Sequence, residues 1–245
     1  MQNLINNFIM EIAEAGQSNA VYGTINDVGM VIALLFGLFH SLKLKNGWWA
    51  TFLTIAVYYF FAGRIASAII YIEDGFRVSG RANAVYAFAY MPLLGFLVAL
   101  IARKNYKAIW DALMVIPLTM FACARVACTV AGCCRGFPTQ WGVYNPVVEQ
   151  PLFPVQLLET LISLAILAFV LWREKKNAFV PDGKNMPIIL ISYGIARFLT
   201  EFLHDDAKIF GFTWMQVHCV VMIAVGILTL KVIQHSEKNA ERQAS

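Results

Sequence analysis

The sequence has little charge and few polar stretches. Only 14% of its 245 residues are charged, whereas 59% are hydrophobic and the mean hydropathy is +0.63. A soluble protein needs a charged surface that this composition does not supply, so we predict an integral membrane protein. The sequence also lacks internal repeats and long linkers, and we therefore expect a single all-helical domain over residues 1–245.

No cleavable signal peptide is expected at the start of the sequence. Glu11 and Glu14 interrupt the segment that would have to form its continuous apolar core. Leu4 and Phe8 instead lie on one face of a predicted helix, so residues 1–24 are expected to lie in the membrane interface or to pack on the bundle.

Seven apolar runs are long enough to cross a bilayer, which needs about 20 helical residues. The predicted spans are residues 25–42, 48–72, 86–102, 109–130, 153–172, 186–204 and 213–233. One set of connecting segments holds twelve Lys and Arg residues and the other set only four, which predicts an outside N-terminus and a cytoplasmic C-terminus. Because these basic residues are scattered, no nucleic-acid partner is expected. Residues 131–152 are expected to form an irregular external loop that carries function. The polar tail, 234–245, is expected to be cytoplasmic and frayed.

Three arginines lie inside predicted spans: Arg64, Arg125 and Arg197. A charge at the bilayer centre costs on the order of 3 kcal/mol, so such residues normally bind something. All three are expected in the outer half of their spans, with few carboxylates opposite them. The pattern predicts an anion site, and lipid phosphate is the nearest abundant anion. The alternative is that Arg197 pairs with Glu201 only to fix helix packing.

Other polar residues gather at the same depth. The spacing of Arg197, Glu201 and His204 places them on one face of a helix. Gln156 and Glu159 begin the fifth span from the same outer side. These side chains are predicted to shape a polar site in the outer half of the bundle.

Two segments carry specific motifs: ARVACTVAGCCRGFPT at 124–139 and YGIARFLTEFLHDD at 193–206, with a weaker one, FPVQLLE, at 153–159. In this order they resemble the signatures of the prolipoprotein diacylglyceryl transferase family. The resemblance implies a seven-span enzyme of the bacterial cytoplasmic membrane, and we expect no cofactor. It takes phosphatidylglycerol from the outer leaflet and transfers the diacylglyceryl group to the thiol of a lipobox cysteine in a secreted prolipoprotein, releasing glycerol phosphate.

The resemblance also implies roles for individual residues. Arg125 and Arg197 would hold the phosphate, because guanidinium offers forked donors to its oxygens. Glu201 would orient Arg197 or bind the glycerol hydroxyls. This sequence departs from the family pattern where Cys128 replaces an Asn, Cys133 replaces a Glu and Tyr90 replaces a His. Its proton handling is therefore expected to differ, and its acceptor is expected to be a thiol or another group.

These considerations give two sets of candidate site residues. The catalytic candidates are Arg125, Arg197, Glu201, Tyr90 and Cys133. The substrate-binding candidates are Arg64, Cys128, Gly132, Cys134, Gly136, Gln156, Glu159 and His204.

The cysteines allow several interpretations. Cys128 is expected close enough to Cys133 or Cys134 to be crosslinked, because a break at Gly132 can fold the chain back. Their spacing matches a zinc site poorly, so no metal is predicted. They could also be small apolar fillers at a helix end. Two further functions stay open: a thiol redox or sulfur-handling membrane enzyme that uses these cysteines, and a phospholipid-binding or transport protein without catalysis.

Overall fold

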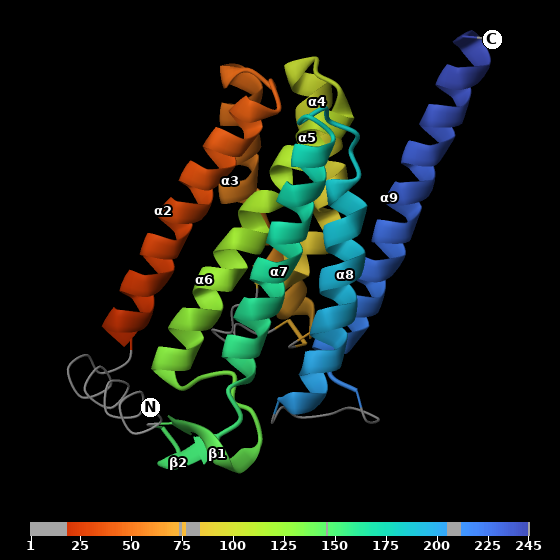
Figure 1. The fold of residues 1–245 in the computed structure, drawn as a ribbon. Helices are drawn as coiled ribbons and strands as arrows, with labels where there is room; N and C mark the ends of the chain where they lie inside the picture. Colours follow the sequence, from red (N-terminus) through yellow and green to blue (C-terminus); the bar gives the residue numbers. More distant parts are fainter. Residues whose placement is uncertain (1–18, 74, 77–83, 146, 205–211, 245) are drawn as a thin grey trace.

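The computed structural model describes residues 19–73, 75–76, 84–145, 147–204 and 212–244. Long helices lie side by side, and a small sheet covers one end of the bundle (Figure 1). Seven helical segments of the described residues are long and apolar enough to cross a membrane, which confirms the predicted fold class. Of the predicted N-terminal interfacial segment, residues 1–18 lie outside the described part.

The predicted spans agree with the helices to within a few residues at most ends. The elements are α2 (Asn19–Lys43), α3 (Trp48–Glu73), η1 (Ala84–Tyr90), α4 (Met91–Ala102), α5 (Tyr106–Leu113), α6 (Val115–Ala131), β1 (Pro138–Asn145), β2 (Gln150–Leu152), α7 (Val155–Lys176), α8 (Asn185–Thr200), η2 (Glu201–Leu203) and α9 (Trp214–Ala244). The third span is therefore η1 followed by α4, where Pro92 is tolerated in the first turn because the N–H groups there have no helical partner.

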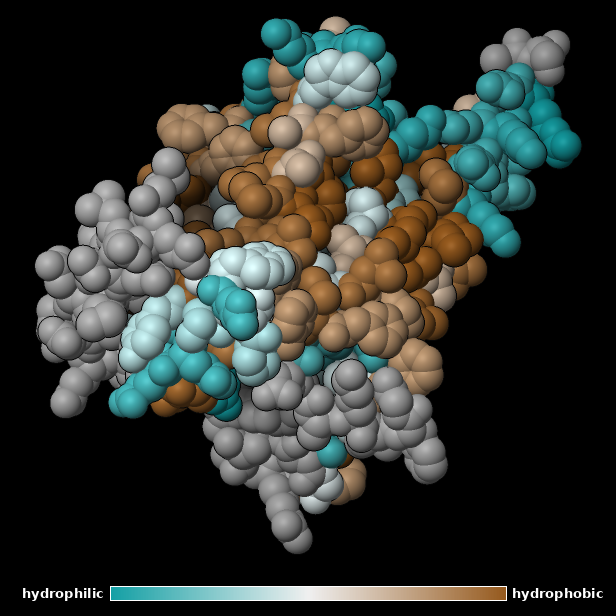
Figure 2. Space-filling view, turned by 60° about the horizontal axis from the view of Figure 1, so that its bottom comes forward, coloured by the Kyte–Doolittle hydropathy of each residue, from teal (hydrophilic) through white to brown (hydrophobic). Residues whose placement is uncertain are grey.

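The fourth span, α5 followed by α6, forms the centre of the bundle. Of its most apolar stretch 72% is buried, against 22% for α3. The outer helices expose large apolar side chains, among them Phe52, Leu100, Leu161 and Leu228. Figure 2 shows, on one face of the molecule, a broad hydrophobic surface between hydrophilic regions, as a lipid-facing belt requires. The central position of α6 buries Arg125.

The ends of the bundle differ as the loop charges predict. The helix ends that carry Lys43, Arg103 and Arg173 lie at one end, and the sheet lies at the other (Figure 1). Which end faces the cytoplasm remains a prediction.

The structure corrects two expectations about irregular segments. The charged tail was expected to fray, but α9 continues to Ala244 because the tail is rich in good helix formers and Glu237 pairs with Lys184 at 3.1 Å. The segment 131–152, expected to be an irregular loop, contains the antiparallel pair β1–β2. There Gly142 lies so close to β2 that a Cβ would meet the Leu152 carbonyl oxygen at 2.2 Å.

Candidate functional site

Glu159 is the centre of a buried polar cluster near the sheet end of the bundle. Its Oε2 pairs with Nε of Arg125 at 2.8 Å, and its Oε1 pairs with Nη1 of Arg197 at 2.6 Å. Thr200 donates its hydroxyl to Oε1 at 2.9 Å, and Nε2 of His204 lies 3.1 Å from the same oxygen. One carboxylate thus joins residues from α6, α7, α8 and the end of η2.

The cluster extends from Arg197 toward α9. Nη2 of Arg197 pairs with Oε2 of Glu201 at 2.7 Å, one helical turn further on. Thr213 donates its hydroxyl to Oε1 of Glu201 at 2.7 Å, and its backbone N–H donates to Gln216 at 3.0 Å. Arg197 and Glu201 face each other as their spacing predicts, and Glu201 joins the end of α8 to the residue before α9. His204 lies beyond the predicted helix, in an extended conformation, and its side chain contacts Glu159.

The expectation of few carboxylates opposite the arginines is wrong for Arg125 and Arg197. Arg125 and Arg197 are balanced by Glu159 and Glu201, and all four side chains are nearly fully buried. Sequence reasoning missed this because α7 contributes Glu159 from far along the chain. These buried ion pairs lower the cost of placing the guanidinium groups in an apolar interior.

Arg125 keeps part of its binding capacity. It contacts Glu159 through Nε, and its guanidinium carbon lies 4.5 Å above the Phe121 ring. Among the described residues no group accepts a hydrogen bond from its two terminal nitrogens. Arg197, in contrast, uses both terminal nitrogens on carboxylates. Arg125 is therefore the arginine with donors available for an additional anion.

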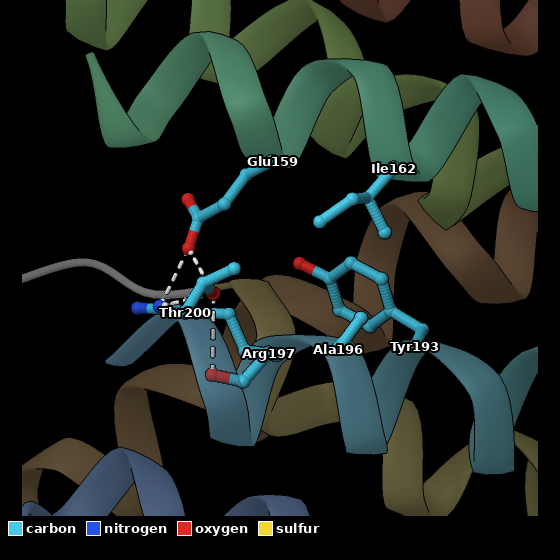
Figure 3. A pocket seen from close by; sticks show the side chains of 6 residues that line it. All are labelled: Glu159, Ile162, Tyr193, Ala196, Arg197 and Thr200. Carbon is cyan, nitrogen blue, oxygen red and sulfur yellow. Dashed lines mark hydrogen bonds and ion pairs between the residues drawn. The ribbon is translucent and has the colours of Figure 1, made fainter. Parts of the chain in front are cut away.

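A narrow crevice between α7 and α8 borders the cluster (Figure 3). Its lining residues are Glu159, Ile162, Tyr193, Ala196, Arg197 and Thr200, and it has no room for a water-sized molecule. The Tyr193 hydroxyl points into the space beside Glu159 and has no hydrogen-bond partner in the described part of the chain. Tyr193 was overlooked as a site residue, although its position four residues before Arg197 places it on the same helix face.

The signature loop after α6 is fixed by buried amides. Gly132 ends α6 with φ +66°, in the left-handed region that favours glycine, and Asn145 donates to its carbonyl oxygen at 3.0 Å. Gln156 donates to the Cys133 carbonyl oxygen at 2.7 Å. Gln156 was predicted to line the site; the structure shows it holding this loop.

Gly136 connects the loop to the cluster. It forms a β-bridge with His204, and a Cβ at this position would meet the Phe153 carbonyl oxygen at 2.4 Å. The Nδ1 atom of His204 is buried with no partner in the described ranges, while Nε2 faces Glu159. The loop after α6 and the Glu159 cluster are thus one structural unit.

Three cysteine sulfurs meet at the same end. The Sγ atoms of Cys128, Cys133 and Cys134 all lie within 4.8 Å of one another, which confirms the predicted proximity. Hydrogen bonds from the Cys128 and Cys133 thiols, together with the positive charge of Arg125, hold the pKa of Cys134 well below its usual value. Of the three thiols, Cys134 is thus the one whose surroundings favour the thiolate form.

Two predicted site residues lie elsewhere. Arg64 is exposed on α3 and donates to the Phe60 carbonyl oxygen of its own helix at 2.7 Å. Tyr90 is 43% exposed at the start of α4. Neither contacts the Glu159 cluster in the described part of the structure, because depth along a span does not determine which way its helix face is turned.

Comparison with known proteins gives a consistent result. The family model described as prolipoprotein diacylglyceryl transferase matches residues 12–232. Phosphatidylglycerol–prolipoprotein diacylglyceryl transferase 2 of Clostridium perfringens is 29% identical over 218 residues, which cover 76% of this chain and 79% of that protein. The phosphatidylglycerol–prolipoprotein diacylglyceryl transferase of Polynucleobacter asymbioticus is 32% identical over 152 residues, or 57% of this chain and 58% of the relative.

Proposed function

Because this chain belongs to the prolipoprotein diacylglyceryl transferase family and is a multi-pass membrane transferase, we propose that it moves the diacylglyceryl group of phosphatidylglycerol to the thiol of a prolipoprotein cysteine. The reaction takes place at the outer face of a bacterial cytoplasmic membrane. The observation that supports this most is Arg125, which is buried, held by Glu159 through Nε, and has two terminal nitrogens available.

The lipid phosphate binds to those terminal nitrogens. Each charge-assisted hydrogen bond contributes about 1.5–3 kcal/mol. The crevice beside Glu159 is too narrow for a head group, so the phosphate lies on the Arg125 side of the cluster. Glu159 fixes the rotation of the guanidinium, and Arg197 holds Glu159 from the other side. Arg197 is therefore a positioning residue. In place of the predicted clamp of two arginines, Arg125 alone binds the phosphate, and Glu159 and Arg197 hold Arg125 in position.

The transfer exchanges one bond for another. The acceptor sulfur, as thiolate, forms a bond to the terminal glycerol carbon of the diacylglyceryl group. The bond between that carbon and the phosphate oxygen breaks, and glycerol phosphate leaves with the electron pair. Negative charge grows on the departing phosphate, where Arg125 stabilises it more strongly than in the bound lipid.

Two acceptor peptides test whether the acceptor group is a thiol. Purified protein in vesicles with head-group-labelled phosphatidylglycerol is given a lipobox peptide, or the same peptide with serine in place of the acceptor cysteine. We expect label release only with the cysteine peptide, because a serine hydroxyl is almost entirely protonated at neutral pH. Equal release with both peptides would contradict the thiol acceptor, and release without any peptide would indicate hydrolysis.

A further inference from the structure

The three converging cysteines carry an inference that rests on the proposed transfer to a thiol. We infer that Cys128, Cys133 and Cys134 form a three-thiolate site for a soft divalent ion of the zinc class, whose fourth position receives the acceptor thiol. The placement of their sulfurs within 4.8 Å of one another is the principal observation. Their thiolates are the ligands that such ions prefer.

The backbone that carries these thiols is shaped to bring them together. Cys128 lies in the last turn of α6, and Gly132 reverses the chain with φ +66°. Cys134 itself has φ +53°, a left-handed conformation that is uncommon for a residue with a side chain and is retained where the surrounding structure imposes it. Gln156 and Asn145, both buried, hold the carbonyl groups of this turn.

The burial of the three cysteines distinguishes this site from the alternatives. Cys133 and Cys134 are exposed, so they are not the apolar fillers considered above; only Cys128 is buried. A disulfide would use two of the sulfurs and leave the third without a function. A metal ion uses all three, and the two exposed thiols give it an entry path.

The distances fit the ion with a small adjustment. Zinc binds thiolate sulfur at about 2.3 Å in tetrahedral geometry, which places two such sulfurs roughly 3.8 Å apart. The observed separations, all within 4.8 Å, exceed this spacing by at most about 1 Å. The cysteine spacing did not predict zinc, because the cysteines do not form two spaced pairs. The turn at Gly132 nevertheless brings the sulfurs of three of them close together.

Three thiolates and a divalent ion carry one net negative charge, which suits a position near the Arg125 guanidinium. The fourth ligand is the acceptor thiol, whose proton is released to solvent when its sulfur binds the ion. That sulfur is then a thiolate at neutral pH and attacks the glycerol carbon, while the carbon–oxygen bond to phosphate breaks as above. The ion thus supplies the proton handling that the acceptor thiol requires.

Cadmium and cobalt provide direct readouts of the site. Reduced, chelator-treated full-length protein in detergent is titrated with Cd²⁺, and thiolate-to-metal charge transfer is followed in the ultraviolet. We expect saturation at one ion per chain, and affinity lower by on the order of 100-fold in Cys134→Ala. Cys123→Ala is the matched control, because Cys123 lies on the same helix as Cys128 but outside the group, and its titration should equal that of the wild type.

The acceptor is tested on the cobalt-loaded protein. The cysteine peptide should change the visible Co²⁺ spectrum, and the serine peptide should not. The inference is overturned if the wild-type protein with its thiols reduced shows no charge-transfer band, if Cys134→Ala titrates like the wild type, or if active protein contains a disulfide among the three cysteines.

Transfer measured on the same samples separates this inference from the proposed function. Full transfer by metal-free protein would overturn the metal's role and leave the transferase intact. The opposite result is one bound ion per chain and a cobalt spectrum that changes with the cysteine peptide, but no lipid transfer. It would support the metal site and overturn the proposed reaction.

Discussion

Glu159→Ala is expected to abolish diacylglyceryl transfer and to destabilise the protein. The variant removes the partner of two buried guanidinium groups, since Arg125 and Arg197 both bind this carboxylate within 2.8 Å. Breaking a buried ion pair by removing one partner costs about 3–5 kcal/mol, because the remaining charge stays in the apolar interior. Here two charges lose that partner, and Arg125 also loses the contact that orients it toward the phosphate.

The loss of activity must be separated from the loss of fold. Transfer is measured per folded molecule, with the folded fraction taken from size-exclusion chromatography and thermal unfolding. Glu174→Gln is the matched control: Glu174 is a second buried glutamate of α7, and it binds His40 at 2.7 Å at the opposite end of the bundle. We expect Glu174→Gln to lower the unfolding temperature but not the turnover of folded molecules. Normal turnover of folded Glu159→Ala would contradict the role given to this carboxylate.

Arg125→Ala is expected to lower turnover by about 100–1000-fold, the usual effect of removing one donor aimed at charge that develops in a transition state. The Arg125→Lys variant should retain only a small part of the wild-type turnover. An ammonium group lacks the planar fork that lets Nε bind Glu159 while the terminal nitrogens bind the phosphate.

The control for Arg125 is Arg103→Ala, which removes an exposed arginine at the other end of the bundle and should keep wild-type turnover. Initial rates at saturating phosphatidylglycerol measure the effect. An Arg125→Lys variant as active as the wild type would show that charge alone suffices and that the proposed fork geometry is wrong.

The parts of the site that sequence predicted correctly are local ones. The pairing of Arg197 with Glu201 follows from helical periodicity, and the proximity of Cys128 to Cys133 follows from a glycine that ends the helix. Such relations depend only on residues a few positions apart, where backbone geometry is known in advance.

Relations between helices were not accessible in the same way. Glu159 pairs with Arg125 and Arg197, 34 and 38 residues away along the chain, and only the packing of α6, α7 and α8 brings the three together. Arg64 illustrates the same point in reverse. Its depth along α3 suggested membership in the site, but the rotation of that helix, which hydropathy does not fix, leaves it exposed.

The central claim is that the acyl-bearing part of the lipid moves to the acceptor while the head group departs. Phosphatidylglycerol labelled with ³H in its acyl chains and with ¹⁴C in its glycerol head group tests this in one reaction with purified protein and the cysteine peptide. We predict equal molar amounts of ³H on the peptide and of ¹⁴C in water-soluble glycerol phosphate, with both signals lost in Arg125→Ala. Intact lipid carrying both labels after prolonged incubation of folded protein, as a binding or transport protein would give, would contradict the account.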